Sequence, residues 1–246
     1  MQVQEFILRV KRAESPLFAR LKWLAKGALT FKLPIPRALD WIFLSISYLR
    51  ALRFEIDERI FVALFRFPLL RAHCSHVGKR LQMEVVPSFH GPIKVYLGDD
   101  VRLSGRLAFS GARIFPDPEV RIGDRTFIGH GSRFSVAKSI TVGNDVLIAS
   151  DCWILDYSGH PLHPELRLAG RQVDPEDVRP VRIEDKVWLG SGAIVLPGVT
   201  IGEGAVIGAA TVVTKDVPRG GICVGNPGRL LSRNVFVSNS RSRDQE

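Results

Sequence analysis

Histidines, prolines and charged residues gather in one short stretch, YSGHPLHPELR, at residues 157–167. His160 and His163 are separated by two residues, and Arg167 follows on the same stretch. An imidazole titrates near neutral pH, so it can accept a proton during a reaction, and it is also a common metal ligand. The stretch therefore suggests either general base catalysis or part of a metal site.

This stretch interrupts a repeat of six residues. From Ile183 the chain reads as six consecutive sextets, IEDKVW-LGSGAI-VLPGVT-IGEGAV-IGAATV-VTKDVP. Each sextet opens on an aliphatic residue and has a small or β-branched residue in fifth place. The same spacing precedes the histidines at Val142, Ile148 and Ile154, and the next position due is His160. The distance from His160 to Ile183 is not a multiple of six. We therefore predict that residues 159–182 leave the repeat as a loop, and long loops on compact scaffolds are usually functional.

A period of six fits neither an α-helix nor a strand that alternates between two faces. It suits a coil with short flat sides, in which the aliphatic side chains point inward and stack on their equivalents one turn above and below. An ordinary sheet with glycine-rich turns does not produce six such sextets in a row. The sequence thus predicts a mainly β solenoid over residues 93–231.

The preceding 92 residues carry helical patterns instead. Ser15-Pro16 marks a helix start, a second helix is expected after Pro36, and a third over residues 57–67, ending before Pro68. Residues 1–90 hold 15 Lys and Arg against 7 Asp and Glu, so most of the net charge of +9 lies there. These amphipathic basic helices either pack against the rest of the protein or a sister subunit, or lie on an anionic membrane surface.

Three further features limit the location and the chemistry. The apolar run WIFLSISYL, residues 41–49, is too short for the ~20 residues that span a bilayer, and the N-terminal residues do not read as a signal peptide. Three scattered cysteines predict reduced thiols and a cytoplasmic protein. His73, Cys74 and His76 are close in sequence, but no second ligand pair accompanies them, so no metal site is expected.

Two segments resemble a known family. DKVWLGSGAIVLPGVTIGEGAVIGAATVVTKDVPRGGICVGNPGRLL, residues 185–231, resembles the C-terminal signature of the hexapeptide-repeat acyltransferases. GHPLHPELR resembles the active-site loop of the galactoside, maltose and nodulation-sugar O-acetyltransferases within that group. The resemblance implies a left-handed parallel β-helix, a homotrimer, acetyl-CoA bound between neighbouring subunits and a saccharide acceptor.

The resemblance also implies residue roles. His160 is expected to be the general base that takes the proton of the acceptor hydroxyl, and the backbone N–H of Ser191 to stabilise the oxyanion. No nucleophilic Ser or Cys is needed because the thioester is already activated. The positions expected to bind acetyl-CoA are Trp188, Ala209, Thr214, Lys215 and Arg229.

The sequence departs from these enzymes at the acceptor side. An asparagine of the family that contacts the acceptor falls on Gly129, with His130 beside it. The helical N-terminal third does not match their short helical cap either. His130, His163 and Arg167 are therefore the candidates for acceptor binding.

Other functions stay open at this stage. The coil also occurs in antibiotic or xenobiotic O-acetyltransferases, in zinc-dependent carbonic anhydrases with three histidine ligands, and in non-catalytic scaffolds. The leading interpretation is an acetyl-CoA-dependent O-acetyltransferase that acts on a sugar or surface-polysaccharide precursor, without a metal and without a nucleic acid partner. We place it in the cytoplasm, with contact to the inner membrane face as a possibility, and expect residues 232–246 to form a flexible tail.

Overall fold

The computed structural model describes residues 3–30 and 36–235. The chain divides into two units, Met1–Ile56 and Asp57–Glu246. The helices of the first unit are α1 (Val3–Arg12), α2 (Pro16–Thr30), the 3-10 turn η1 (Arg37–Leu39) and the greater part of α3 (Asp40–Phe61). α2 begins where the sequence predicts it, because the hydroxyl of Ser15 accepts a 3.3 Å hydrogen bond from the N–H of Phe18 as a cap.

The helices differ from the prediction at three points. Helix α1 is not among the predicted helices; it packs on α2 through Phe6 and Phe18, with ring centroids 5.8 Å apart. The second and third expected helices are largely one continuous helix, α3. Beyond it the π-helical turn η2 (Val62–Arg66) leads into α4 (Phe67–His73), so the expected stop before Pro68 is wrong. Pro68 lies in the first turn of α4, where its missing N–H is tolerated, and the π turn shifts the hydrogen-bond spacing just before it.

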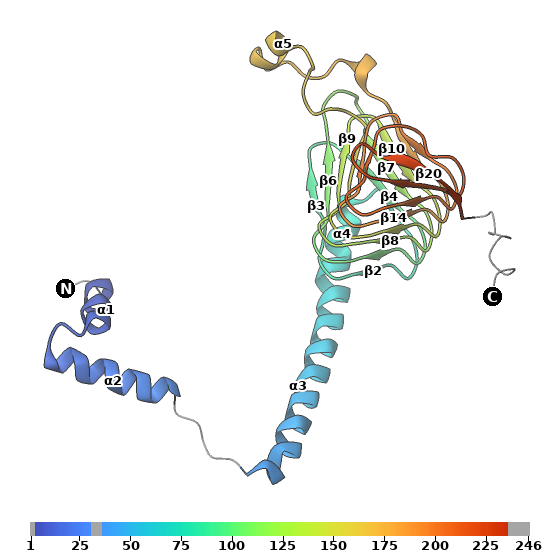
Figure 1. The fold of residues 1–246 in the computed structure, drawn as a ribbon. Coiled ribbons are helices and arrows are strands. Elements are labelled where there is room, and N and C mark those ends of the chain that lie inside the picture. Colours follow the sequence, from blue (N-terminus) through green and yellow to red (C-terminus); the bar gives the residue numbers. More distant parts are fainter. Residues whose placement is uncertain (1–2, 31–35, 236–246) are drawn as a thin grey trace, which may run out of the picture. The chain divides into compact units, whose positions relative to one another are not determined.

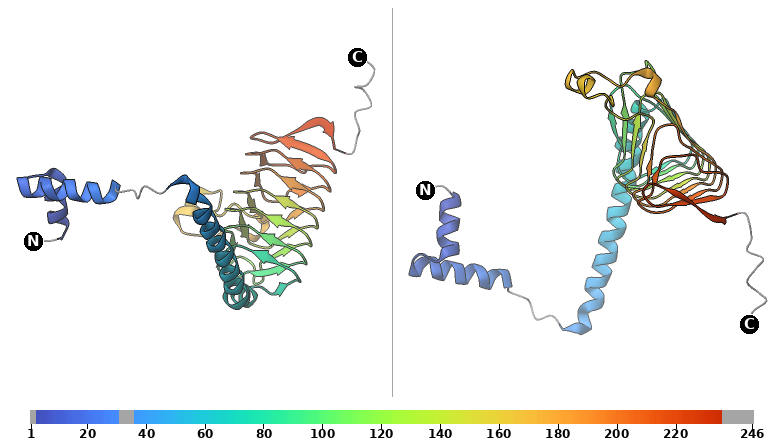
Figure 2. Two further views of the ribbon diagram at one scale, coloured as in Figure 1. Left: turned by 90° about the horizontal axis from the view of Figure 1, so that it is seen from below. Right: turned by 45° about the horizontal axis from the view of Figure 1, so that its top comes forward.

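The second unit is a left-handed parallel β-helix with a triangular cross-section, which confirms the predicted fold class (Figures 1 and 2). Each turn gives one strand to each of three sheets. Sheet A contains β1 (His76–Val77), β4 (Lys94–Leu97), β7 (Glu119–Ile122), β10 (Ser139–Val142), β13 (Val181–Ile183) and β16 (Thr200–Ile201). Sheet B contains β2 (Gln82–Met83), β5 (Arg102–Leu103), β8 (Phe127–Ile128), β11 (Leu147–Ile148), β14 (Trp188–Leu189), β17 (Val206–Ile207), β19 (Gly221–Val224) and the antiparallel β20 (Arg229–Asn234). Sheet C contains β3 (Ser88–His90), β6 (Ala108–Gly111), β9 (Arg133–Val136), β12 (Trp153–Leu155), β15 (Ile194–Val195) and β18 (Val212–Val213).

Both repeating positions of the sextets point into the coil. The six opening aliphatic side chains, from Ile183 to Val213, are at most 1% exposed, and the fifth-place side chains are at most 3% exposed. Equivalent residues stack in register, as Val142, Ile183 and Ile201 do in sheet A. One sextet therefore forms one side of the triangle, and the aliphatic stacks form a core that continues along the axis.

The sequence predicts that the coil starts at residue 93. The structure shows that it starts one turn earlier, at β1. The residues of this extra turn that stack under the next one are Val77, Met83 and Phe89. They are also six apart, but Met83 and Phe89 are not the branched aliphatic residues that mark the later sextets. Leu70 of α4 is fully buried in the same core, so α4 contributes to it at this end.

A column of stacked rings runs up one side of the core. The centroid distances are 4.9 Å for His73 and Phe89, 5.7 Å for Phe89 and Phe109, and 5.0 Å for Phe109 and Phe134. His73 thus extends an aromatic stack. In the part of the chain that the structure describes, no three His, Cys, Asp or Glu side chains are grouped as metal ligands.

Two segments leave the coil at the corner between sheets C and A. The longer one, called the excursion here, comprises residues 156–180 between β12 and β13 and contains α5 (Pro164–Leu168) and the turn η3 (Pro175–Asp177) (Figure 1). The shorter one, residues 112–118, joins β6 to β7. The two segments meet in a small apolar cluster of Ala137, Val173 and Val178 with Ala112, Ile114, Phe115 and Tyr157.

The C-terminal residues only partly match the expected tail. Residues up to Asn234 belong to β20, which pairs with β19. The expected flexible segment from residue 236 onward lies outside the described residues. No helix among the described residues is long and apolar enough to cross a membrane.

Candidate active site

Asp156 anchors the start of the excursion. Its side chain is fully buried, and its carboxylate accepts three backbone hydrogen bonds of 2.6, 2.7 and 2.8 Å from Ala137, Lys138 and Ser139. Its own carbonyl accepts a 2.9 Å hydrogen bond from the N–H of Arg179, which closes the neck of the excursion. Burial raises the pKa of the Asp156 carboxyl, and the backbone donors oppose that shift. This residue therefore fixes the backbone from which the histidine stretch departs.

His160 follows four residues later, directly after Gly159, whose φ of +81° lies in the left-handed region. Its side chain is exposed and lines a pocket of about 520 Å³. The backbone carbonyl of His160 accepts a 2.7 Å hydrogen bond from the Ser158 hydroxyl, which fixes the turn. None of the described residues forms a hydrogen bond with its imidazole, so both ring nitrogens are open to a substrate.

Both charged and apolar side chains line this pocket. Arg113 comes from the 112–118 segment, and Arg167 and Arg171 come from the excursion. Ile114 and Val173 also line it and belong to the small apolar cluster where the two segments meet. A volume of this size accommodates a small sugar.

The two other candidates in the excursion differ in position. Arg167 lines the pocket and also holds the loop, because its Nη1 donates to the carbonyl oxygens of Pro161 at 3.0 Å and Leu162 at 2.5 Å. His163 is exposed at the start of α5 and does not line the pocket. The structure brings Arg167, but not His163, to the side of His160.

Ser191 and Ala209 lie at another corner, between sheets B and C, and Trp188 lies in β14 just before that corner. Trp188 is 51% exposed on the outer face of sheet B. Ser191 and Ala209 lie on successive turns of the corner, where the N–H of Ala210 donates to the Ser191 carbonyl at 2.8 Å. The strands of sheet C run from this corner to the corner of His160, and one side of six residues is about 20 Å long. Within one chain, Ser191 and His160 are therefore far apart.

His130 belongs to the same corner as Ser191. Its Nδ1 accepts a 3.2 Å hydrogen bond from the N–H of Arg106, and it does not line the His160 pocket. Its neighbour Gly129 takes the place of the family's asparagine. A Cβ there would lie 2.6 Å from the backbone of Ala149, so this position excludes any side chain unless the turn above moves.

Thr214, Lys215 and Arg229 form a second pocket of about 470 Å³ at the C-terminal end of the coil. Thr214 follows β18 at the corner of His160, two turns further along the axis. Arg229 donates to the carbonyl of Gly228 at 3.2 Å, and Asp216 also lines this pocket. Two cationic side chains and a hydroxyl are groups that bind phosphate, so these residues fit the phosphates of coenzyme A.

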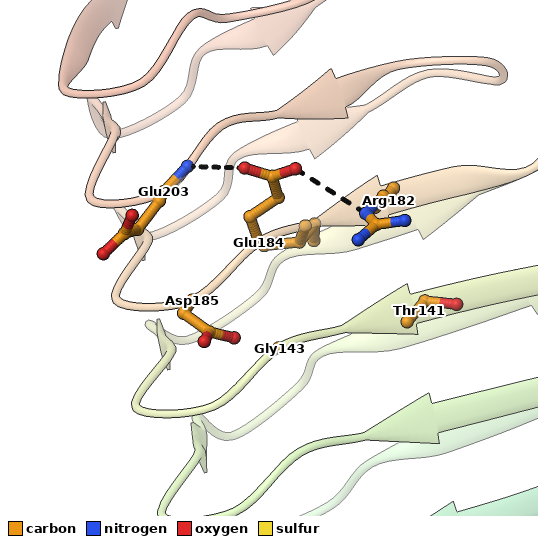
Figure 3. Close-up of a pocket in the computed structure, with 7 residues that line it drawn as sticks. Thr141, Gly143, Arg182, Glu184, Asp185 and Glu203 are labelled. Atoms are coloured by element: carbon orange, nitrogen blue, oxygen red, sulfur yellow. Dashed lines mark hydrogen bonds and ion pairs between the residues drawn. The ribbon is translucent and has the colours of Figure 1, made fainter.

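A third, smaller pocket of about 210 Å³ lies at the corner between sheets A and B (Figure 3). Glu184 accepts a 3.0 Å hydrogen bond from the N–H of Glu203 and lies 3.7 Å from Arg182 (Figure 3). Asp185 accepts a 2.8 Å hydrogen bond from the N–H of Asn144. These carboxylates hold the corner together, and we assign them no catalytic role.

The comparisons with known proteins match residues of the coil. The family model of the bacterial transferase hexapeptide matches residues 180–215, and that of the hexapeptide repeat of succinyl-transferase matches residues 119–152. A galactoside O-acetyltransferase from Lactococcus lactis is 47% identical over 105 residues, which are 43% of this chain and 48% of that protein. The galactoside O-acetyltransferase of Escherichia coli is 42% identical over 93 residues, 38% of this chain and 43% of that protein. Over these residues the chain is similar to hexapeptide-repeat acetyltransferases, among them sugar O-acetyltransferases.

Solved structures extend the likeness over more of the chain. A hexapeptide-repeat acetyltransferase from Vibrio cholerae is 28% identical, with 78% of this chain and 93% of that chain covered and a TM-score of 0.50. An N-acyltransferase from Bacillus cereus, 23% identical, covers 68% of this chain and 87% of its own with a TM-score of 0.56, which shows a common fold. The chain spans about half the length, or less, of the curated relatives it matches, such as the two galactoside O-acetyltransferases.

Sequence reasoning missed several residues of this site. Asp156 directly precedes the histidine stretch, and an acid at the end of a repeat indicates an anchoring role. Arg113 and Arg171 were not singled out, because their place beside His160 depends on how the 112–118 segment and the excursion stack at one corner.

Proposed function

We propose that this chain transfers an acetyl group from acetyl-CoA to a hydroxyl group of a saccharide or a surface-polysaccharide precursor, with His160 as the general base. The observation that carries the proposal is the exposed imidazole at the base of the excursion, open to a pocket of about 520 Å³. The similarity of the coil to galactoside O-acetyltransferases also supports the proposal.

The reaction proceeds by direct transfer in a ternary complex. His160 accepts the proton of the acceptor hydroxyl while that oxygen forms a bond to the thioester carbonyl carbon. The carbonyl oxygen becomes negatively charged and accepts a hydrogen bond from the backbone N–H of Ser191. The carbon–sulfur bond then breaks, and the imidazolium returns its proton to the departing thiolate. Proton and electron pair balance without a covalent enzyme intermediate.

Residues at the corner of His160 and residues at or near the corner of Ser191 bind acetyl-CoA along the coil. Lys215 and Arg229 bind its phosphates with Thr214 beside them, since these side chains share one pocket. Trp188 and Ala209 contact the pantetheine arm towards the acyl end. Thr214 and His160 share a corner two turns apart, which supports this direction for the donor.

The active protein is a homotrimer. Because Ser191 and His160 lie at opposite ends of sheet C, a neighbouring copy has to bring its Ser191 corner to the His160 corner of the first. An apolar column on the outer face of sheet B supports such an interface, and consists of Phe127, Leu147, Trp188, Val206 and Ile222 in register. Leu147 and Trp188 are 44% and 51% exposed in the single chain.

The protein acts in the cytoplasm, with its helical unit resting on the anionic inner face of the membrane. The large apolar side chains exposed on α2 and α3 include Trp23, Trp41 and Tyr48, at 72%, 65% and 74%. Basic residues outnumber acidic ones in this part of the chain, which adds attraction to anionic headgroups. Flotation with anionic and with neutral vesicles tests this. We expect the wild-type protein to float with the anionic vesicles and the Trp23→Glu/Trp41→Glu variant to stay in the bottom fraction. Equal flotation of both proteins contradicts membrane binding by the helical unit.

The activity is tested by an acceptor screen. The full chain is incubated with acetyl-CoA and with monosaccharides, oligosaccharides and lipid-linked saccharides, and the release of free thiol is measured. Chloramphenicol and aminoglycosides in the same screen test the antibiotic O-acetyltransferase alternative. Acetylation of a saccharide, checked by mass spectrometry, supports the proposal. Thiol release with none of the saccharides, from protein that binds acetyl-CoA, contradicts it.

A further inference from the structure

Three arginines are among the residues that line the pocket of His160. Arg113 projects from the 112–118 segment, Arg167 from α5, and Arg171 from the chain that follows α5. The pocket lining contains neither Asp nor Glu. The excursion does carry acidic residues, namely Asp156, Glu165, Asp174, Glu176 and Asp177, but none of them lines the pocket. The positive charge in the pocket is therefore not neutralised locally.

The bonding of these arginines differs from that of basic residues elsewhere on the coil. Arg125 forms a two-point pair with Asp145 at 2.7 and 2.8 Å, and Lys186 pairs with Glu203 at 3.0 Å. Arg167 instead donates to two neutral carbonyl oxygens, which fix its position and leave its charge. Among the described residues, Arg113 and Arg171 form no ion pair with a carboxylate.

We propose that the acceptor carries an oxyanion, a phosphate or a carboxylate on the saccharide, and that Arg113 and Arg171 bind it while His160 deprotonates a hydroxyl of the same molecule. This inference rests on the proposed acetyltransferase function and names its substrate class. A guanidinium binds phosphate and carboxylate through two parallel hydrogen bonds, so two such groups also orient the sugar. A pocket with charge of one sign raises the local concentration of an oppositely charged substrate.

The remaining lining suits the sugar itself. The pocket volume of about 520 Å³ lies within the range of small-ligand sites. Ile114 and Val173 offer an apolar surface for the C–H face of a sugar ring, and Gln172 and Tyr157 offer polar groups for hydroxyls. The three arginines come from two separate segments of the chain, so an anion between them would also hold these segments together.

The test compares acceptors that share a galactose ring and differ in charge, because galacturonate carries a carboxylate at carbon 6 and galactose 1-phosphate a phosphate at carbon 1. Acetylation by the full chain is measured with galactose, galacturonate and galactose 1-phosphate at fixed acetyl-CoA. We expect kcat/KM to be about tenfold or more higher for at least one anionic sugar, since hydrogen bonds to charged groups contribute more than neutral ones. Comparing the rates with galacturonate and with galactose 1-phosphate shows whether the pocket prefers a carboxylate or a phosphate. Raising the salt concentration lowers this preference, because the charges face water.

Matched variants locate the effect. Arg113→Gln and Arg171→Gln each raise KM for the anionic sugar about tenfold, and they raise KM for galactose by a much smaller factor because galactose has no anion for them to bind. KM for acetyl-CoA stays the same. Arg182→Gln, an exposed arginine on sheet A outside this pocket, changes none of these values. A rise in KM for acetyl-CoA in the two pocket variants assigns the arginines to the donor and overturns the proposal. Equal or better use of galactose by the wild type overturns it as well.

A binding measurement separates this inference from the proposed function. Titration calorimetry with galacturonate and with galactose 1-phosphate is carried out without acetyl-CoA. Binding by the wild type that is lost in Arg113→Gln/Arg171→Gln supports the anion site, even if no acceptor is acetylated and the proposed function fails. Binding that is absent, or that is unchanged in the double variant, overturns the anion site while acetylation of neutral sugars can still stand.

Discussion

The backbone N–H of Asn144 donates a 2.8 Å hydrogen bond to the carboxylate of Asp185, across 41 residues of sequence. The same corner contains equivalent bonds of 2.8 Å on earlier turns, from Asp99 to Asp124 and from Asp124 to Asn144. The turn that follows the excursion is thus joined to the one before it by the ordinary contacts of the coil. The excursion is thus an insertion that leaves the hydrogen bonds between successive turns of the coil at this corner unchanged.

The coil is therefore expected to fold without the excursion. Replacing residues 158–178 by a short glycine-serine linker keeps Asp156 and Arg179, whose backbone bond closes the neck. A loop contributes little closure free energy once its ends are fixed, so we expect the circular dichroism spectrum to be retained and Tm to change by a few degrees. Acetyl transfer disappears because His160 is gone. Loss of cooperative unfolding in this variant would contradict the additive role of the excursion.

His160→Asn is expected to lower kcat by about 10²–10⁴-fold, the usual contribution of a general base, with KM for acetyl-CoA nearly unchanged. Initial rates of thiol release, measured with the acceptor found in the screen, test this. His163→Asn is the matched control, because His163 lies on the same loop but outside the pocket, and we expect it to keep more than half of the activity. Similar rates for the wild type and His160→Asn would remove the base from the mechanism.

The periodic part of this protein could be predicted from its sequence. Six-residue spacing identifies the inward positions because one sextet makes one flat side, and the opening and fifth residues of all six sextets from Ile183 are buried as expected. The first turn was missed since Met83 and Phe89 fill the same positions with unbranched or aromatic side chains. The left-handedness of the β-helix is predicted by the family resemblance, because the six-residue spacing alone carries no information about handedness.

The site could be predicted only in part. The place of His160 follows from counting sextets, since it occupies the first missing aliphatic position. Arg113 could not be placed beside it in this way, because the turns before β13 differ in length. Leu97 pairs with Ile122 and Ile122 with Val142, at spacings that are not 18 residues. Contacts between insertions depend on these irregular turns and on the stacking of both segments at one corner.

Asp156→Asn is expected to destabilise the protein by about 1–3 kcal/mol near pH 5, because the amide turns a donor towards one of three backbone N–H groups. Burial raises the pKa of Asp156 in the folded chain. The folded state thus binds the proton more tightly, and this carboxyl contributes most to stability below its unfolded pKa of ~3.9. Its contribution is lost as the pH rises through the folded pKa. Urea unfolding of both proteins from about pH 4 to about pH 8 measures the difference between their free energies of unfolding. This difference should become smaller as the pH rises. A difference that grows with pH would contradict the raised pKa of Asp156.

The thiols of Cys74 and Cys152 are expected to react slowly in the folded protein. Burial raises the pKa of Cys74 to about 12 and that of Cys152 to about 11, so the reactive thiolate is scarce near pH 8. Reaction with Ellman's reagent should therefore be slow in buffer and complete in denaturant. Cys152→Ala serves as a control that removes one slow thiol. Rapid labelling of two or more thiols in folded protein would show that the core opens readily.

Leu147→Arg is expected to convert the proposed trimer into single chains. Leu147 lies between Phe127 and Trp188 in the apolar column of sheet B, and a guanidinium there places a charge in the middle of the proposed interface. Size-exclusion chromatography with light scattering should give three chain masses for the wild type and one for the variant. Acetyl transfer should fall with trimer content, because Ser191 and His160 then no longer meet. Leu168→Arg, on the excursion and 83% exposed, is the matched control and should remain trimeric. A wild-type protein that runs as a single chain and is fully active would refute the shared site, since one chain would then have to bring both corners together by itself.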